Sequence, residues 1–348
     1  MRSKRKLAFA LVALFVLSTV APAIGPTMAQ SDERVLYIAM QQDMPNFNNW
    51  DLASNSVWKN YILGKWCWEG LTGLDPDGNI FRNLAEDYTL DPETLTVDIT
   101  IRQGVTFHDG ETMDADDVIF SFKSLRNGGT YSSNIVNAFD TDGDGTVSMD
   151  EFDGTISSQD DGIYDGWTKI DQYTVKAVMG RSYGQFLLQT LGVPIIPEHI
   201  WSAHLTADMT VDTLWNDKTA SIGTGPLLYH SGQENVFRRM VKFDDYWGKD
   251  FTTPSGHYIY PQAVDEIYFK LYSSLDTAIL ALKSGQVDHI PWTVTPGYVP
   301  DLIQNPNTYF QSISDNGYFY LAFNQKREPM NHLGFRKAVS HTIDKETI

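Results

Sequence analysis

The sequence predicts a mixed α/β fold of the α+β type, because strand-like and helix-like segments follow one another without strict alternation. Strand-like segments alternate apolar and polar residues, and helix-like segments repeat apolar residues at helical spacing. The chain has 348 residues, of which 42% are hydrophobic and 20% are charged. This composition is globular and supplies a core large enough for two domains or more.

The first half of the chain carries clear signals for individual elements. Residues 35–40 (VLYIAM) form a short apolar strand. Apolar residues at helical spacing over 57–67 predict a helix, which Ser54 or Asp51 can cap. Residues 94–102 alternate as a half-buried strand. Asp114 then caps a helix that carries Asp117 at its third position.

Residues 127–166 differ from their surroundings, since they are rich in Gly, Ser, Asp and Asn, and they form a predicted insertion. Within it we expect a short helix over 133–139. Regular structure resumes at residue 173. We expect strands at 173–178, 236–242, 264–270 and 318–324, helices at 185–191, 194–201, 275–284 and from 334 onward, and a tight turn at 223–226.

The N-terminus has the pattern of a secretory signal peptide. Four basic residues at 2–6 precede an apolar run over 7–20, and small residues at 21–23 and 27–29 offer cleavage sites. The run is shorter than the roughly 20 residues of a spanning helix, although an uncleaved anchor is the alternative. We expect cleavage after Ala29 and a secreted, extracytoplasmic protein.

Charge and cysteine content exclude several classes of function. Removing residues 1–29 would change the formal net charge from −18 to −22, a surface that repels nucleic acid and anionic lipid. The single cysteine, Cys67, excludes an intramolecular disulfide. It lies in an apolar context (KWCW), where we expect a buried, inert thiol, and no cysteine is available for lipid attachment at the cleavage site.

Residues 140–151 (DTDGDGTVSMDE) match every demanding position of an EF-hand calcium loop. Asp140, Asp142 and Asp144 supply carboxylates at positions 1, 3 and 5, and Gly145 at position 6 permits the sharp turn. Thr146 offers its backbone carbonyl, Ser148 at position 9 acts through water, and Glu151 supplies two oxygens. The predicted cofactor is therefore Ca²⁺, with a merely acidic, solvated loop as the alternative.

The flanking helices are short and no second loop exists in the sequence, so the pattern favours a structural clamp over a sensor. We expect the loop to bind Ca²⁺ weakly, with a dissociation constant of about 10⁻⁵ to 10⁻³ M.

One pattern imitates a catalytic site. Residues 180–184 (GRSYG) match a nucleophile elbow around Ser182, between a strand and a helix. The preceding strand alternates and carries Lys176, which is unlike the buried parallel strand that such a site needs. We therefore predict that the chain is not an enzyme, and a secreted serine hydrolase is the weakest alternative.

Several stretches together resemble one family, the extracytoplasmic solute-binding proteins of family 5, which serve peptide-type ABC transporters. The most specific stretch is 101–118 (IRQGVTFHDGETMDADDV). Others are WEGL at 68–71 with DPDG at 75–78, NLAE at 83–86, GTGPL at 223–227 and YWG at 246–248. Toward the C-terminus they continue with SGQVD at 284–288, LAFN at 321–324 and FRKAV at 335–339.

The resemblance implies a two-lobed, hinged architecture of the type II periplasmic binding proteins. Residues 30–71 and 186–320 would form domain I. Residues 72–185 would form the domain II appendage, which contains the 127–166 insertion, and 321–348 would begin domain III. The chain stops within a helical pattern, so we expect a fragment whose second lobe is largely missing.

The resemblance also implies that a peptide or similar small solute binds between the lobes and passes to an ABC permease, without reaction. Ala53, Ser54 and Asn55 match the backbone-contact loop, and Tyr318 and Tyr320 match cleft-facing positions or are buried sheet residues. We expect a monomer that binds no nucleic acid. The main alternative from a different class is a calcium-dependent adhesion or docking protein.

Overall fold

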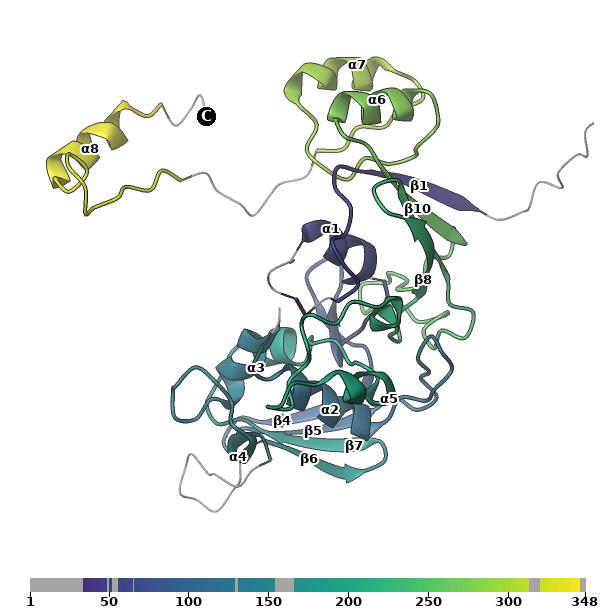
Figure 1. Ribbon diagram of the computed structural model, residues 1–348, viewed down its shortest axis with the longest axis vertical. Helices are drawn as coiled ribbons and strands as arrows, with labels where there is room; N and C mark the ends of the chain where they lie inside the picture. The colour runs from purple at the N-terminus through teal and green to yellow at the C-terminus, as the bar shows by residue number, and fades with distance from the viewer. Residues whose placement is uncertain are drawn as a thin grey trace, which may run out of the picture. The chain divides into compact units, whose positions relative to one another are not determined.

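The computed structural model describes residues 34–48, 50–51, 56–64, 66–128, 131–153, 166–312 and 320–344 (Figure 1). The predicted signal peptide lies outside this part of the chain. The chain divides into two compact units, Met1–Thr293 and Val294–Ile348. Within the described residues, each helix is too short or too polar to cross a bilayer.

The first sheet of the larger unit has four strands in the order β1-β10-β9-β8. β1 pairs with β10 in parallel, and the other pairs are antiparallel. One face packs on a short helix, α1 (Val57–Lys59), that continues into a π-helical turn over Asn60–Gly64. The strands are β1 (Val35–Met40), β8 (Leu227–Gln233), β9 (Phe237–Lys242) and β10 (Glu266–Leu271).

The other face of β1 packs on α6 (Leu275–Lys283). Ala39 contacts Ala278 and Ala281 of this helix in a small buried cluster. The predicted helix over 275–284 is confirmed, and Gly285, with a φ of 71°, follows its last turn. The structure adds an N-cap, Ser274, whose side chain accepts from the amide of Thr277.

The second sheet is fully antiparallel, in the order β4-β5-β7-β6. Its side chains alternate as predicted on β5, where Val97, Ile99 and Ile101 are buried. A two-stranded hairpin, β2 (Thr72–Leu74) with β3 (Ile80–Arg82), precedes it. The strands of the second sheet are β4 (Ala85–Asp91), β5 (Thr96–Ile101), β6 (Gly166–Asp171) and β7 (Thr174–Val178).

Helix α2 (Ala115–Leu125) lies across the second sheet (Figure 1). Phe122 stacks on Trp167 of β6 at 3.9 Å between ring centroids. The predicted capping box is present, because Asp114 accepts a hydrogen bond from Asp116 and the Asp117 carboxylate accepts one from the backbone of Asp114. The sequence prediction for this helix is confirmed.

The inserted segment contains two short helices, α3 (Ser132–Phe139) and α4 (Met149–Phe152), on either side of the predicted calcium loop. Residues 154–165 lie outside the described residues. β6 begins at Gly166, whereas the sequence prediction placed the return of regular structure at residue 173. The prediction was wrong here because β6 is mostly exposed along its length and lacks an alternating apolar pattern.

Three further helical predictions need correction in length or type. The expected helix over 57–67 is one helical turn and one π-helical turn, capped by Ser56. The expected helix over 185–191 is a π-helical turn, Phe186–Thr190. The expected helix over 194–201 is α5 (Glu198–Trp201), followed by a 3₁₀ turn over Ser202–His204, and another 3₁₀ turn spans Lys218–Ser221.

The smaller unit contains a 3₁₀ turn (Pro296–Tyr298), α7 (Val299–Gln304) and α8 (Leu333–Thr342). The helix predicted from 334 onward is confirmed. The strand predicted over 318–324 is wrong for residues 320–324, which belong to no strand, and residues 318 and 319 lie outside the described residues.

Loops from the two sheets meet at one carboxylate, Glu69. Its oxygens accept hydrogen bonds from Thr224 Oγ1 (3.0 Å), Tyr246 Oη (2.7 Å) and Trp247 Nε1 (3.1 Å). Glu69 precedes the hairpin that leads to the second sheet, whereas the three donors flank β8 and β9 of the first sheet. Burial raises the pKa of Glu69, and the three donors oppose that shift. These four residues are termed the Glu69 junction.

His108 makes a second connection beside this junction. Its Nε2 lies 2.9 Å from the carbonyl oxygen of Gly225, and its Nδ1 accepts the amide of Gly223 at 3.3 Å. Both contacts fit a neutral ring that carries its proton on Nε2. The glycines are required by close approach, since a Cβ at Gly225 would lie 2.2 Å from the carbonyl oxygen of Trp66.

We predict that Tyr246→Phe lowers the free energy of unfolding by roughly 1–3 kcal/mol, because it removes one donor from a partly buried carboxylate. Urea denaturation measures the change. Tyr258→Phe, at a side chain that is 59% exposed, is the matched control and should leave stability unchanged. Equal stability of the two variants would show that the junction does not hold the loops together.

We also predict that His108 makes the protein less stable in acid. Burial lowers the pKa of His108 from 6.5 to about 4. Between these values the unfolded chain binds more protons than the folded one, so stability falls as pH drops through this window. Each pKa unit corresponds to about 1.4 kcal/mol.

His108→Gln should therefore lose less stability than the unchanged protein between neutral pH and pH of about 4. Unfolding free energies measured across this range provide the test. His230→Gln, at an exposed histidine, is the control. Parallel pH profiles for the unchanged protein and His108→Gln would refute the assignment.

Candidate functional site

The predicted calcium loop brings three of its carboxylates together. Oxygens of Asp140, Asp142 and Asp144 all lie within 4.8 Å of one another. Asp140 is buried at the end of α3, and the other two carboxylates are exposed. Gly145 has a φ of 88°, the left-handed conformation that the sharp turn requires. This arrangement offers clustered hard oxygen ligands, the kind that Ca²⁺ prefers.

Glu151 and Thr146, the remaining predicted ligands, do not belong to that carboxylate group. Glu151 is buried, and its carboxylate accepts hydrogen bonds from the backbone and hydroxyl of Thr141 (2.8 and 2.6 Å) and from the Ser148 amide (2.7 Å). Burial opposes ionisation of Glu151, but these hydrogen bonds outweigh it and lower its pKa. Thr146 donates to Asp144 through its amide and hydroxyl. The ligand set stays a prediction.

The loop is anchored at Val147, its eighth position, to the end of α2. The Val147 amide donates to Asn127 Oδ1 (2.7 Å), and the Val147 carbonyl accepts from Asn127 Nδ2 (2.5 Å) and Arg126 Nε (3.1 Å). Arg126 is itself 3% exposed and also donates to the carbonyls of Lys123, Asp208 and Met209. The backbone at this position is therefore satisfied by side chains of the same domain, without a second calcium loop.

The predicted solute-contact residues are mostly outside the described part of the chain. Four of them are not among the described residues: Ala53, Ser54, Asn55 and Tyr318. Tyr320 is described and is 77% exposed in the smaller unit, in a segment without regular structure. The solute-binding roles of these five residues stay predictions.

The segment before the predicted contact loop is held by a buried lysine that sequence reasoning missed. Lys59 is completely buried, and its Nζ donates to Asn46 Oδ1 (3.0 Å) and to the carbonyl of Asn48 (2.6 Å). Asn46 in turn donates to Asp51 (2.8 Å). Burial lowers the pKa of Lys59 to about 8, and the nearby Asp51 opposes the shift. A signal was available, since Lys59 falls at helical spacing with the buried Ile62 and Leu63.

An ion pair between Asp43 and Arg238 fixes the same segment to the first sheet. Asp43 accepts two hydrogen bonds from Arg238 of β9, at 2.8 and 2.6 Å, and one from the Asn235 amide. Both charged side chains are about one tenth exposed. Such a bidentate pair orients both partners. Residues 43–48 and 50–51, which precede the predicted contact loop in the sequence, are thus held in place by these contacts.

The hydrolase-like pattern has none of the expected geometry. Ser182 is exposed and follows β7, a strand of an antiparallel sheet. Across the described ranges, no hydrogen bond joins Ser182 to a histidine. The antiparallel pairing explains why the nucleophile-elbow motif carries no catalytic meaning here.

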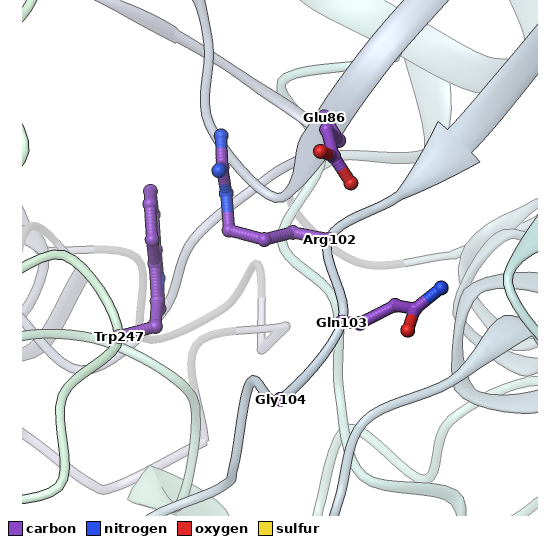
Figure 2. A pocket seen from close by; sticks show the side chains of 5 residues that line it. All are labelled: Glu86, Arg102, Gln103, Gly104 and Trp247. Atoms are coloured by element: carbon purple, nitrogen blue, oxygen red, sulfur yellow. The ribbon is translucent and has the colours of Figure 1, made fainter.

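A separate pocket of about 620 Å³ opens beside the Glu69 junction (Figure 2). Its lining residues come from β4, from the segment after β5 and from the loop after β9. None of them belongs to the predicted calcium or solute residues. They are Glu86, Arg102, Gln103, Gly104 and Trp247.

Comparison with known proteins places the chain in a family. Residues 79–348 match the model of the bacterial extracellular solute-binding proteins, family 5 middle region. The oligopeptide-binding protein AppA of Bacillus subtilis is 24% identical over 281 residues, which are 80% of this chain and 44% of AppA. The glutathione-binding protein GsiB of Salmonella paratyphi A is 22% identical over 342 residues, 97% of this chain and 56% of GsiB. The chain thus spans about half the length of these relatives.

Solved structures show the same fold. The crystal structure of NikZ from Campylobacter jejuni in complex with Ni(L-His) matches with a TM-score of 0.67 at 19% identity, covering 90% of this chain and 54% of NikZ. The predicted fold class, a mixed α/β fold of the type II periplasmic binding proteins, is confirmed by this similarity. The family consists of binding proteins, in agreement with the prediction that the chain is not an enzyme. The chain belongs to the bacterial extracellular solute-binding proteins of family 5.

Proposed function

We propose that the whole protein captures a small solute outside the cytoplasm and delivers it to an ABC permease in the membrane. The observation that carries this proposal is the family match over residues 79–348. The N-terminal signal pattern supports export. Binding without chemistry accords with Ser182, which follows an antiparallel strand.

We propose a peptide, or a solute with peptide-like groups, as the ligand. The relatives are named for binding oligopeptides and glutathione, and NikZ was crystallised with a nickel–histidine complex. Amino-acid groups are common to all three ligands. The hydrogen bonds of Lys59, Asp43 and Arg238 hold described residues on either side of 53–55. This supports a contact loop at 53–55, because an extended peptide binds at lower entropic cost where the flanking chain is already ordered.

We predict that the full-length gene product carries a solute when it is purified without denaturation. Native mass spectrometry should show an added mass, and denaturation should release it for identification. Thermal-shift measurements with di- to nonapeptides, free amino acids and glutathione then rank the solute classes, since a ligand that binds only the folded state raises the melting temperature. Turnover of the captured solute, or no shift with any class, would contradict the proposal.

We further propose that residues 140–151 bind Ca²⁺ as a structural clamp. Three clustered carboxylates and the left-handed glycine support this ion. The anchoring of Val147 by Arg126 and Asn127 supports a structural role, because a loop fixed at its centre to α2 cannot open as a sensor does. The calcium would then shape the insertion without switching solute affinity.

We predict that Ca²⁺ raises the melting temperature relative to chelator. At about one hundred times its dissociation constant, an ion that binds only the folded state stabilises by about 2.7 kcal/mol. Asp144→Asn should abolish this shift, although an asparagine oxygen can still accept from Thr146. Asp150→Asn, at a loop position that supplies no ligand, should retain it. Melting that is insensitive to calcium, or calcium-dependent solute affinity, would overturn the structural assignment.

A further inference from the structure

The pocket beside the Glu69 junction contains an arginine whose head group is already fixed in place. The guanidinium carbon of Arg102 lies 4.4 Å from the ring centroid of Trp247 and 5.5 Å from that of Phe251. Its Nε donates to the carbonyl of Asn83 at 3.1 Å. Trp247 is held in turn by its bond to Glu69. Stacking and hydrogen bonding therefore remove most of the rotamer freedom that ligand binding would otherwise cost.

The terminal nitrogens of Arg102 have no hydrogen-bond acceptor within the part of the chain that the structure describes. Figure 2 shows the guanidinium group between the Trp247 ring and the Glu86 carboxylate. A guanidinium with two unused, parallel donors is suited to a carboxylate, which it can bind in a bidentate manner.

Glu86 supplies the opposite charge in the same pocket. It is exposed on β4, and it attracts Arg102 without forming an ion pair with it among the described residues. The two charges leave the pocket close to neutral. A dianion such as phosphate would be repelled by Glu86 and by a chain of net charge −18, whereas a molecule with both charges would satisfy both groups.

We propose that this pocket is a second binding site, for a free α-amino acid held by its zwitterionic backbone. The carboxylate pairs with the terminal nitrogens of Arg102, and the ammonium group pairs with Glu86. The volume of about 620 Å³ lies in the ordinary range for small-molecule pockets and leaves room for a side chain. None of the lining residues belongs to the proposed solute loop at 53–55, and the proposal does not depend on that loop.

The reporter for this site is the Nε–H of Arg102, which is hydrogen-bonded and lies at the pocket. In ¹H–¹⁵N spectra of the full-length protein, Arg102→Lys identifies its signal. L-alanine is the probe, with propionate as its carboxylate-only analogue and ethylamine as its ammonium-only analogue. We expect alanine to shift the signal at millimolar concentration, propionate to bind about tenfold more weakly, and ethylamine not to shift it.

The variant Glu86→Gln tests whether the pocket recognises both charges of an amino acid or its carboxylate alone. This exposed substitution should weaken alanine binding about tenfold and leave propionate binding unchanged or tighter. Glu93→Gln, at an exposed residue in the β4–β5 turn, should behave as the unchanged protein.

Equal affinity for alanine and propionate, or an unchanged alanine affinity in Glu86→Gln, would refute the proposal that the pocket recognises both charges of an amino acid. No shift of the Arg102 signal with any probe would refute the site. Either result leaves the proposed solute function standing, because binding at the solute loop is measured by co-purification and thermal shift without this reporter.

Discussion

The carboxylate of Glu69 is the constraint on which the arrangement of the larger unit depends. Thr224, Tyr246 and Trp247 come from loops of the first sheet and converge on a residue that leads into the second. A carboxylate withdrawn from water is stable only where donors replace its hydration. The requirement is mutual, since the buried hydroxyl of Tyr246 and the indole of Trp247 also need an acceptor. Loops far apart in sequence are thereby fixed at one point.

His108 and the glycines extend this constraint to the backbone. The imidazole bridges two glycine backbones, and these glycines allow the chain at 223–225 to pass within van der Waals contact of the carbonyls of Trp66 and Cys67. Any larger residue at these positions would push the loop away from Glu69. Four of the stretches that carry the family resemblance, WEGL, FHDG, GTGP and YWG, therefore meet in space.

The sequence predicted those elements whose cause is local. The Asp114 capping box, the alternation on β5 and the helix over 275–284 each depend on residues close together in the sequence, and each is present. The predictions failed where tertiary contacts decide. β6 has little apolar periodicity of its own and exists because it pairs with β7, and the turn at Asn60–Gly64 is widened while its residues pack under the first sheet. Lys59 and Glu69 were missed for the same reason, because their partners lie elsewhere in the sequence.

A lone calcium loop is compatible with this fold because the domain supplies the anchor. Arg126 and Asn127, at the end of α2, satisfy the backbone of Val147, and Arg126 also ties the loop to the carbonyls at 208 and 209. Trp247 likewise joins two parts of the structure beside the pocket. Its indole N–H donates to Glu69, and its ring face stacks against Arg102. A ligand bound to Arg102 would therefore also restrict the ring of Trp247, which already belongs to the Glu69 junction. Occupancy of that pocket and stability of the junction are then linked through a single indole ring.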